Sequence, residues 1–467
     1  MKTNPILLST LSALALSGCA AGPDYVAPIP PAAASGPFLS ANDAAFTPAP
    51  VPAGWWRLYD DPVLDGLVQD ALAANTDVRA SVVRIERARA ALRGARADRL
   101  PQTSVGASAS YGRSPDSQVL PNADRENWSL DTGIQVSYEA DLFGRVSRGI
   151  EAGRAGVEAA DADADAVRMI VVADTARAYT DAASDAARLR VAREIVDLLD
   201  RSLDLTRKRH DAGLATGLDV ARIAGLRQQR AAEIPQIEAE RQAALFRLAT
   251  LTGRTPAELP SIAGARSVPL EITKPLPVGD GRQLLARRPD VRAAERRLAA
   301  DTAQIGVATA DLYPHITFGA SLGSTGPDIG DVFTGGPLRW LLGSLLSWAF
   351  PNQEPARARI AAAKADTQAS LAHFDGTVLL ALQESETALS NYAKSLERRG
   401  ALQAAEKEAE KSAGITRAQQ REGRINSLDL LDAERTLAEA RAQLADQDGA
   451  VSAAQVDLFR ALGGGWE

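Results

Sequence analysis

The residues that could carry out chemistry are few and stand far apart along the chain. The 467 residues contain one cysteine, Cys19, and three histidines, His210, His315 and His373. The histidines follow no metal-ligand spacing, so solvated or structural side chains are the better interpretation. A single cysteine excludes an intramolecular disulfide framework and a cysteine-cluster metal site. These counts argue against an enzyme and predict no metal or other cofactor.

One acidic stretch looks superficially like a calcium-binding loop. Asp161, Asp163 and Asp165 alternate with alanine. A calcium loop also needs glycine at its sixth position and a bidentate glutamate at its twelfth, where this chain has Ala166 and Val172. The stretch therefore predicts a polar stripe on a helix. The sequence also contains no P-loop, zinc-helix or nucleophile-elbow pattern.

Cys19 belongs to a targeting segment. A positive residue, Lys2, precedes the apolar residues 6–16, and small residues lead to the cysteine in Leu16-Ser17-Gly18-Cys19. The apolar stretch is too short to span a bilayer core of about 30 Å, which predicts a signal peptide over residues 1–18. The motif resembles a bacterial lipobox, in which Cys19 would become the lipidated N-terminus. An ordinary signal peptide with an incidental cysteine is the alternative.

The residues after the targeting segment indicate where in the cell the chain is expected. Ala20, rather than Asp, follows the cysteine, which by resemblance to sorted lipoproteins favours the outer membrane. Residues 19–54 are rich in proline and alanine and are predicted to form an extended tether. The formal charge of −7 gives no basic excess for nucleic acid. No later segment reads as a transmembrane helix, so a membrane crossing by the mature chain would have to use β-strands.

The chain contains an internal duplication. Residues 77–80, Asp-Val-Arg-Ala, recur as residues 290–293, an offset of 213. Further along the offset becomes 210, where Gly213 matches Gly423 and Gly253 matches Gly463. A register held over some 180 residues predicts two copies of one unit, residues 55–262 and 263–467.

Each copy is predicted to contain a helix, a strand pair and a long helical hairpin. Residues 122–234 and 356–467 lack proline and are rich in alanine, which favours long helices. The first copy has a helix at about 77–99, a strand pair at about 102–141, and a hairpin at about 146–253 made of helices 146–210 and 219–253. The second copy has a helix at about 290–312, a strand pair at about 315–350, and a hairpin at about 356–462 made of helices 356–421 and 428–462.

The predicted strands alternate between apolar and polar residues. Residues 128–140 place Trp128, Ile134 and Tyr138 on one face, whereas Asp131 and Glu139 fall on the other. A half-buried sheet in a soluble domain is one interpretation. Strands of about ten residues, with aromatic residues near their ends and a charged polar face, favour a transmembrane barrel instead. Four strands would leave open edges in lipid, so the chain must oligomerise, and three chains would supply twelve strands.

Several motifs, in this order and spacing, resemble the TolC-like outer membrane factors, and specifically their NodT/OprM-type lipoprotein branch. The resemblance implies a chain that is mainly α with transmembrane β. Three chains would form a twelve-stranded barrel in the outer membrane of a Gram-negative bacterium and an α-helical barrel in the periplasm. The motifs are Gly22-Pro23-Asp24-Tyr25 after Cys19, Trp55-Trp56 with Asp61-Pro62, residues 138–145 (Tyr-Glu-Ala-Asp-Leu-Phe-Gly-Arg), Arg288-Pro289-Asp290-Val291, and residues 461–466 (Ala-Leu-Gly-Gly-Gly-Trp).

The same resemblance implies a function and partners. Such proteins are passive exit ducts of tripartite efflux systems. They receive solutes from an inner-membrane pump, here expected to be of the resistance-nodulation-division type, through a periplasmic adaptor. The alternative is that the chain is itself a periplasmic adaptor lipoprotein, which would need one hairpin flanked by β-rich, lipoyl-like halves.

The family's functional positions map to the two hairpin turns and the residues just after them. The turns would contact the adaptor, and the following residues would close the periplasmic entrance, where a threefold ring of aspartates would attract cations. Arg222, in place of a second aspartate, is expected to pair with a neighbouring Asp and hold the gate shut. A solvated helix start is the alternative for these charges. The turn residues are Gly213, Leu214, Ala215, Thr216 and Gly217 in the first copy and Gly423, Arg424, Ile425, Asn426 and Ser427 in the second; the gate residues are Leu428, Asp429, Asp432, Asp219 and Arg222, with Leu218 as the first-copy counterpart of Leu428.

Overall fold

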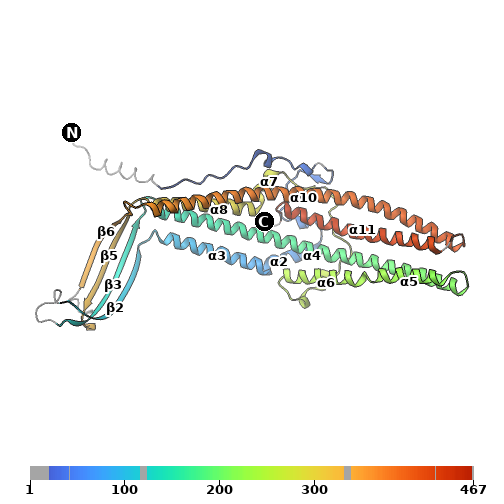
Figure 1. Ribbon diagram of the computed structural model, residues 1–467, viewed down its shortest axis with the longest axis horizontal. Coiled ribbons are helices and arrows are strands. Elements are labelled where there is room, and N and C mark those ends of the chain that lie inside the picture. The colour runs from blue at the N-terminus through green and yellow to red at the C-terminus, as the bar shows by residue number, and fades with distance from the viewer. Residues whose placement is uncertain (1–19, 42, 116–123, 331–337, 426, 465–467) are drawn as a thin grey trace. The chain divides into compact units, whose positions relative to one another are not determined.

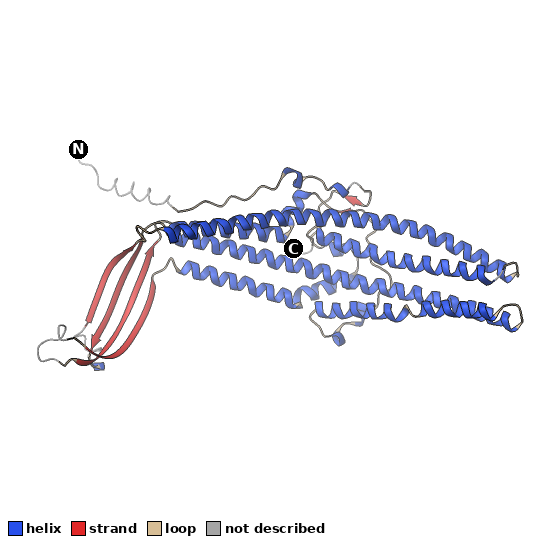
Figure 2. Ribbon diagram, viewed as in Figure 1, coloured by secondary structure: helices blue, strands red, loops and turns tan. Residues whose placement is uncertain are grey.

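The computed structural model describes residues 20–41, 43–115, 124–330, 338–425 and 427–464. Helices dominate, and they accompany one four-stranded sheet (Figure 2). The chain forms two compact units. The first contains the described residues up to 28 together with residues 84–160 and 293–374, and the second contains residues 29–83, 161–292 and 375–467.

The two sequence copies contain corresponding elements, with α2 (Pro62–Ala74) and α7 (Gly281–Arg287) added before the helix that opens each copy. None of the described helices is both long and apolar enough to cross a membrane. The first copy consists of α3 (Thr76–Ala97), β2 (Gln102–Arg113), β3 (Glu126–Ala140), α4 (Arg145–Asp211), α5 (Gly217–Ala231) and α6 (Ile234–Leu251). The second consists of α8 (Pro289–Ala310), β5 (His315–Gly326), β6 (Leu338–Ser347), α10 (Glu354–Arg421) and α11 (Ser427–Ala461).

The sheet has the strand order β2-β3-β5-β6, and every pair is antiparallel (Figure 1). Its register places Val105, Ile134, Leu322 and Trp340 in one row across all four strands. These four side chains are exposed in the single chain, Val105 at 80% and Trp340 at 74%. Since paired residues on neighbouring strands point to the same side, the row forms an apolar stripe on one face.

The opposite face of the sheet is polar over β2, β3 and β5, whereas β6 adds the exposed Leu341 and Leu345 to it. Asp131 accepts hydrogen bonds from Arg339 on β6 and, at 2.8 Å, from the hydroxyl of Thr325 on β5. The next row contains Gly133 and Gly323, which keep the backbones of β3 and β5 close. The alternation predicted from the sequence therefore corresponds to two chemically different faces of one sheet.

The junction from β3 to α4 shows what the residues of the 138–145 motif do in this chain. Asp141 accepts hydrogen bonds from the backbone of Val146 at 3.0 Å and Ser147 at 2.8 Å, so it satisfies donors in the first turn of α4. Gly144 adopts a φ of +79°, which a residue with a side chain rarely does. Arg145 donates to Glu139 at 2.8 Å and fixes the end of the strand relative to the helix.

The residues at the start of the described chain are packed against the first unit. Ala21 donates to the carbonyl of Phe143 at 2.9 Å, and the buried Arg148 pairs with Asp24 at 2.6 Å. A Cβ added to Gly22 would lie 2.4 Å from the Cα of Gly306, so the two backbones are in direct contact. The prediction of an extended tether over residues 19–54 is therefore wrong for this part, because specific contacts hold it.

The later part of the expected tether is also packed, within the second unit. Phe38, Phe46 and Val51 are buried in its main core. Strand β1 (Phe46–Thr47) pairs in parallel with β4 (Leu276–Pro277), and the short helices η2 (Ala32–Ser35) and η3 (Leu39–Ala41) precede it. Apolar side chains spaced among the prolines anchor this segment, a tertiary effect that composition does not reveal.

The core of the second unit brings distant sequence motifs together. Trp55, in the short helix η4 (Trp55–Tyr59), is fully buried and stacks on Phe459 of α11 with ring centroids 4.8 Å apart. Asp61 begins α2 by accepting from Val63 at 2.9 Å, and its other oxygen accepts from Arg266 at 2.7 Å. The residues of the Trp55-Trp56 and Asp61-Pro62 motifs are thus packing and capping residues.

The helix predicted over residues 219–253 is two helices. It is interrupted at Ala232–Glu233, between α5 and α6. Pro235 stands in the first turn of α6, where it can begin a helix but could not continue one, because it lacks a backbone N–H and clashes with the preceding turn. The sequence prediction of one continuous helix was wrong at this proline.

The duplication is visible in the backbone at four glycines. Gly213 and Gly423 each have a φ of 73°, and Gly253 and Gly463 have φ values of 67° and 73°. Each follows a helix whose last carbonyls accept hydrogen bonds from the glycine and from the residue after it. This is the Schellman termination, for which glycine is preferred because its φ is positive. Equivalent glycines end equivalent helices at the offset of 210 found in the sequence.

Candidate functional site at the hairpin ends

The two hairpin turns have the same local geometry. In the first, Gly213 donates to the carbonyl of His210 at 2.8 Å and Leu214 donates to that of Arg209 at 2.7 Å. In the second, Gly423 donates to Gln420 at 3.0 Å and Arg424 donates to Gln419 at 2.9 Å. The long helices α4 and α10 therefore end in matched turns that expose their tips. Leu214 is 69% exposed, which leaves an apolar side chain in solvent at the first tip.

The first helix after the turn begins with a capping box. The Thr216 hydroxyl accepts from the backbone of Asp219 at 3.2 Å, and the Asp219 carboxylate accepts from the backbone of Thr216 at 2.9 Å and from its hydroxyl at 2.7 Å. Both interactions satisfy backbone donors at the start of α5. Asp219, predicted as a gate residue, thus also stabilises this helix start.

The capping box makes the first turn of α5 sensitive to acid. The hydrogen bonds from the Thr216 side chain and backbone, helped by the charge of Arg222, hold the pKa of Asp219 below its usual range. A carboxyl with a lowered folded pKa stabilises the fold at pH above its unfolded value of about 3.9, and this contribution is lost as the pH falls further. We expect amide protection at residues 218–220 to decrease between about pH 5 and pH 3.

Hydrogen exchange, corrected for intrinsic rates, measures this change. The Asp219→Ala variant is expected to show low protection at both pH values, because it has no carboxylate to titrate. Thr216→Ala should weaken the same turn by about 1 kcal/mol. A wild-type protection profile that does not change with pH would contradict the claim that the Asp219 carboxylate stabilises the first turn of α5.

The second hairpin places its predicted gate residues in the first two turns of α11. Leu428 is 47% exposed, and Asp429 and Asp432 are also exposed. Asp432 forms an ion pair with Arg435 at 3.3 Å. Asn426 lies outside the described residues, and for Ser427 the structure describes the backbone but not the side chain. Exposed carboxylates at the start of a helix are favoured by its dipole.

One contact behind the turns links the two hairpins. Arg209 near the end of α4 donates to the backbone carbonyl of Gln420 near the end of α10 at 3.1 Å. Gln420 is buried, and its carbonyl also accepts the hydrogen bond from Gly423. Sequence reasoning missed this link, because a single arginine on a charge-rich helix carries no signal of its partner. The capping box, by contrast, is readable as Thr-x-x-Asp at residues 216–219.

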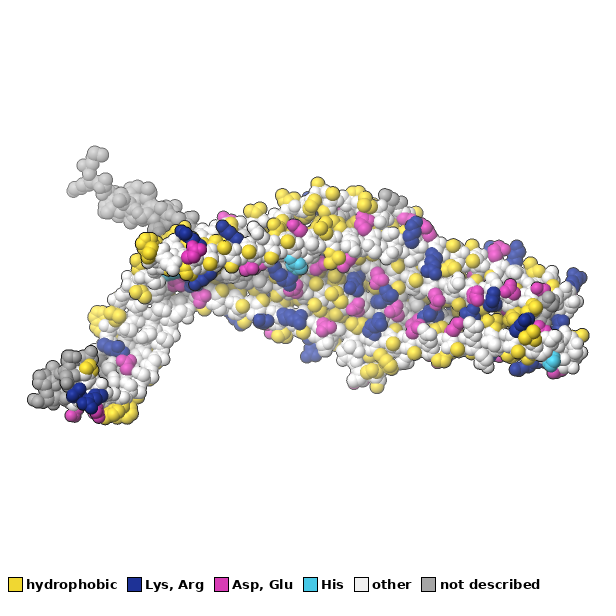
Figure 3. Space-filling view, viewed as in Figure 1, with side chains coloured by type: hydrophobic (Ala, Val, Ile, Leu, Met, Phe, Trp, Pro, Cys, Tyr) yellow, Lys and Arg dark blue, Asp and Glu magenta, His cyan; other side chains and the backbone are white. Residues whose placement is uncertain are grey.

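Ion pairs connect the two helices of each hairpin. Figure 3 shows Lys/Arg and Asp/Glu side chains interspersed along these helices. In the first hairpin Arg227 forms a two-bonded pair with Asp200 at 2.9 and 3.1 Å. In the second, Arg417 forms a similar pair with the buried Glu434 at 2.7 and 2.9 Å. The hydrogen bonds to Glu434 raise the pKa of Arg417. The pairs fix the register between the two helices of each hairpin.

The described part of the chain contains no cluster of three or more histidine, cysteine or acidic residues that could hold a metal ion. Cys19, the predicted lipid attachment site, lies outside the described residues. The described residues form two matched hairpin ends with acidic helix starts in the second unit and, in the first unit, one sheet with an apolar and a polar face.

Comparison with known proteins connects this arrangement to a family. The model of the family described as "Outer membrane efflux protein" matches residues 67–254 and again residues 281–464. The chain belongs to the outer membrane efflux protein family. The two matched segments correspond to the two copies found by self-comparison of the sequence, and each ends at the glycine-terminated helix of its copy.

Individual relatives cover nearly the whole chain. It is 30% identical over 482 residues to the antibiotic efflux pump outer membrane protein ArpC of Pseudomonas putida, covering 99% of this chain and 96% of the relative. It is 29% identical over 435 residues to nodulation protein T of Rhizobium leguminosarum bv. trifolii, covering 92% and 91%. Among solved structures, the outer-membrane channel OprN aligns with a TM-score of 0.89 at 36% identity, covering 96% of this chain and all of that one.

These similarities confirm the predicted family and fold class, the NodT/OprM-type outer membrane factor. They also confirm the predicted function, an outer membrane channel of an efflux system. Nothing in these comparisons supports the alternative of a periplasmic adaptor lipoprotein. The two hairpins per chain, where an adaptor needs one, agree with that outcome.

Proposed function

We propose that three copies of this outer membrane efflux protein form a passive duct. Solutes enter at the hairpin ends and leave through a barrel of twelve strands. The observation that carries the proposal is the four-stranded sheet with one exposed apolar row, one charged face and two unpaired edge strands, β2 and β6. Its apolar face is unfavourable in water, and its unpaired edge strands are unfavourable in lipid. When three sheets close into one barrel in the membrane, the apolar faces contact lipid and every edge strand gains a partner.

The helical hairpins are proposed to form the periplasmic part of the duct. Alanines are buried along α4, which allows neighbouring helices to pack closely. The hairpin ends would form the entrance, with Asp429 and Asp432 of each copy in a ring. Six carboxylates in a narrow opening would attract cations and repel anions. Arg222, for which the structure describes no ion pair within one chain, is proposed to pair across the entrance with an aspartate of a neighbouring copy.

The turns themselves are proposed to bind a periplasmic adaptor. The two turns share one backbone geometry, so one adaptor surface could engage both kinds of tip. Leu214 and Leu218 are exposed at the first tip at 69% and 58%, and would provide apolar contact area. An inner-membrane pump, expected to be of the resistance-nodulation-division type, would deliver the solutes. The duct would perform no catalytic step and would need no cofactor.

Cys19 is proposed to carry a covalent lipid that anchors the chain in the outer membrane of a Gram-negative bacterium, with the helices in the periplasm. The support is the lipobox-like motif in the sequence. The ordered contacts of Ala21 and Asp24 with the first unit also begin only two residues after the cysteine.

Two measurements on protein purified from the outer membrane test the assembly and the anchor. Unheated samples on a denaturing gel should migrate near three times the mass of the mature chain, which lacks residues 1–18 of the 49.2 kDa sequence, and heated samples near the single-chain mass. Mass spectrometry should find acyl chains on the N-terminal peptide, and Cys19→Ser should abolish them. A monomer in unheated samples would refute the trimer, and an unmodified cysteine in the mature protein would refute the anchor.

A further inference from the structure

A cavity in the second unit brings several charged side chains together. It has a volume of about 510 Å³ and lies between α4, α6 and α11. Binding sites for small organic molecules have volumes of about 300–1,000 Å³ and combine apolar walls with a few polar groups. The charged residues that line this cavity are Asp181, Asp185, Glu240 and Asp446, together with Arg177, Arg188 and Arg247.

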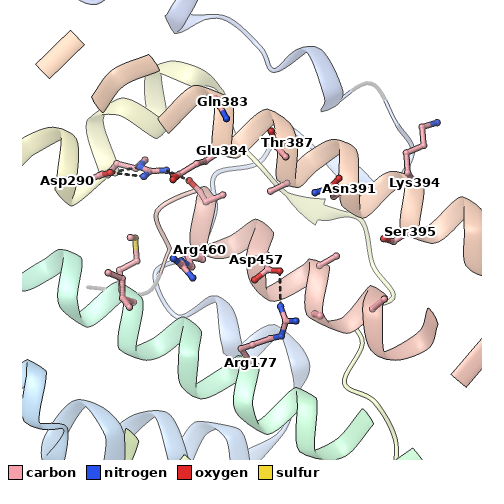
Figure 4. A pocket seen from close by; sticks show the side chains of 18 of the residues that line it. Arg177, Asp290, Gln383, Glu384, Thr387, Asn391, Lys394, Ser395, Asp457 and Arg460 are labelled. Atoms are coloured by element: carbon pink, nitrogen blue, oxygen red, sulfur yellow. Dashed lines mark hydrogen bonds and ion pairs between the residues drawn. The ribbon is translucent and has the colours of Figure 1, made fainter. Parts of the chain in front are cut away.

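One set of these charges is balanced. Arg177 donates to Asp181 at 2.9 Å and to Asp457 of α11 at 2.8 Å, and the second contact is drawn in Figure 4. Arg247 approaches the other oxygen of Asp181 at 3.6 Å. Two cations therefore accompany two carboxylates in this set, which leaves no surplus charge for a ligand.

The other set places three carboxylates around one guanidinium group. The Nη1 atom of Arg188 donates to Asp185 and to Glu240, at 2.8 Å each, and its Nε atom donates to Asp446 at 2.6 Å. One positive charge therefore faces three negative charges. Since Asp446 alone balances the arginine, Asp185 and Glu240 have no further cation among the residues that line the cavity.

Asp185 and Glu240 are held close to each other. Both accept from the same nitrogen at 2.8 Å, so the two accepting oxygens lie within twice that distance of one another. The other oxygen of Glu240 accepts from Gln236 at 3.0 Å, which fixes this side chain on α6. The Glu240 side chain is 40% exposed and that of Asp185 only 12%. A solute can therefore reach the pair from water and move toward its buried member.

Burial makes the surplus negative charge unfavourable at Asp185. Desolvation raises the pKa of Asp185 against the opposing effect of Arg188, and the charges of Glu240 and Asp181 add to the rise. A positive group within about 4–6 Å of a carboxylate favours its ionised form. A second cation beside Asp185 and Glu240 would thus offset the cost of keeping both carboxylates charged.

A buried hydroxyl group next to Asp185 gives an independent indication of a ligand. Ser184 is 5% exposed, and its hydroxyl has no hydrogen-bond partner among the described residues. It lines the cavity together with Gly449 of α11, where an added Cβ would lie 3.3 Å from the hydroxyl oxygen. Because buried polar groups are normally paired, this hydroxyl is suited to accept a hydrogen bond from an N–H group of a ligand.

Small apolar side chains form the remaining wall of the cavity. They are Ala243 and Ala244 on α6 and Ala450 and Ala453 on α11. Their short side chains leave space and an apolar surface against which an aromatic or aliphatic group can pack. The described residues include no group of acidic, histidine or cysteine side chains that could hold a metal ion. The lining therefore favours an organic cation over an inorganic one.

We propose that this cavity is a binding site for organic cations. The ammonium or amidinium group of the ligand donates to the carboxylates of Asp185 and Glu240 and to the hydroxyl of Ser184, and its apolar part packs against the alanines. All of these residues belong to one chain and one unit, so the site does not rest on the proposed duct. The inference goes beyond the proposed function because it assigns a class of ligand to the helical part of the protein.

Equilibrium dialysis of the detergent-solubilised full-length protein with naphthylmethylammonium at low salt tests the site. The wild type should bind this cation, and raising the salt concentration should weaken binding. The double variant Asp185→Asn/Glu240→Gln should bind it at least about tenfold more weakly, because two charge-assisted hydrogen bonds are lost.

The matched control is Asp197→Asn/Glu238→Gln. It removes two exposed carboxylates, each paired with an arginine, from the same two helices and outside the cavity. The net charge changes as it does in the cavity variant, and the acidic hairpin ends are the same in all proteins compared. The control should therefore bind as the wild type does. Equal losses of binding in the two double variants would overturn the proposal.

A further variant tests the hydroxyl without disturbing an ion pair. Ser184→Ala removes a group that has no partner in the described chain, so it should fold as the wild type does and bind about threefold more weakly. If circular dichroism shows that the cavity double variant does not fold, unchanged binding by Ser184→Ala decides against the site. A wild type that binds no cation, or that binds naphthalenesulfonate equally well, also overturns it.

Discussion

The double variant Asp429→Ala/Asp432→Ala is expected to raise the conductance of the reconstituted channel. Asp432 pairs with Arg435 at 3.3 Å in the second turn of α11, and both carboxylates are exposed at the proposed entrance. The proposed pairs between Arg222 and an aspartate of a neighbouring copy exist only in the closed arrangement; at about 0.5 kcal/mol for each exposed pair, three copies contribute about 1.5 kcal/mol to it. Losing that amount shifts the ratio of closed to open channels by about tenfold.

The variant should also become less selective for cations, because the ring of negative charge is gone. Single-channel recording in a planar lipid bilayer measures both the open fraction and the reversal potential in a salt gradient. Asp446→Ala is the matched control. It removes an exposed aspartate from the same helix, α11, at a position away from the turn. The ion pair that this aspartate forms with Arg188 of α4, at 2.6 Å, is lost with it. Conductance that is unchanged in the double variant would remove both aspartates from the gate.

A charge placed on the apolar face of the sheet should have the largest effect on assembly. Ile134 lies in the middle of β3, between Val105 and Leu322 in the exposed apolar row. An arginine facing lipid near the bilayer midplane costs about 2–4 kcal/mol, and three copies multiply this to roughly 6–12 kcal/mol per trimer. We expect Ile134→Arg to abolish insertion of the channel into the outer membrane.

The adjacent residue provides the matched control. Gln135 follows Ile134 on the same strand and points to the polar face, so Gln135→Arg places the same charge toward water. The heat-resistant trimer recovered from outer membranes should be lost in the first variant and retained in the second. Equal recovery of both, or a greater loss with Gln135→Arg, would mean that the apolar row does not face lipid.

Much of the fold could be predicted from the sequence because its signals are local. Strict alternation over residues 128–140 determines which side chains share a face, and proline-free alanine-rich stretches determine the long helices. The duplication then predicts that the second copy repeats the first, including the terminating glycines at 213 and 423. These features need no knowledge of long-range contacts.

The parts that sequence reasoning missed depend on tertiary contacts or on a single residue. Residues 20–54 read as a tether by composition, yet Phe38 and Phe46 anchor them in a core built from distant segments. In β6 the leucines come in pairs, at 341–342 and 345–346, so the alternation is blurred although the register is regular. One proline, Pro235, decides the break between α5 and α6.

The candidate site was predictable to a similar extent. Matched glycines and aspartates after two helices located the hairpin ends, and the family resemblance supplied their roles. The contact from Arg209 to Gln420 could not be foreseen, because it joins helices more than 200 residues apart in sequence.

Single-channel recording of the purified wild-type protein in a planar lipid bilayer tests the central claim most directly. The account predicts stepwise, long-lived conductance from trimers, with a preference for cations that is set by the acidic entrance. Heat-dissociated single chains from the same preparation should give no conductance, because four strands cannot close a barrel. A protein that remains monomeric in detergent and gives no conductance at any concentration would contradict the duct.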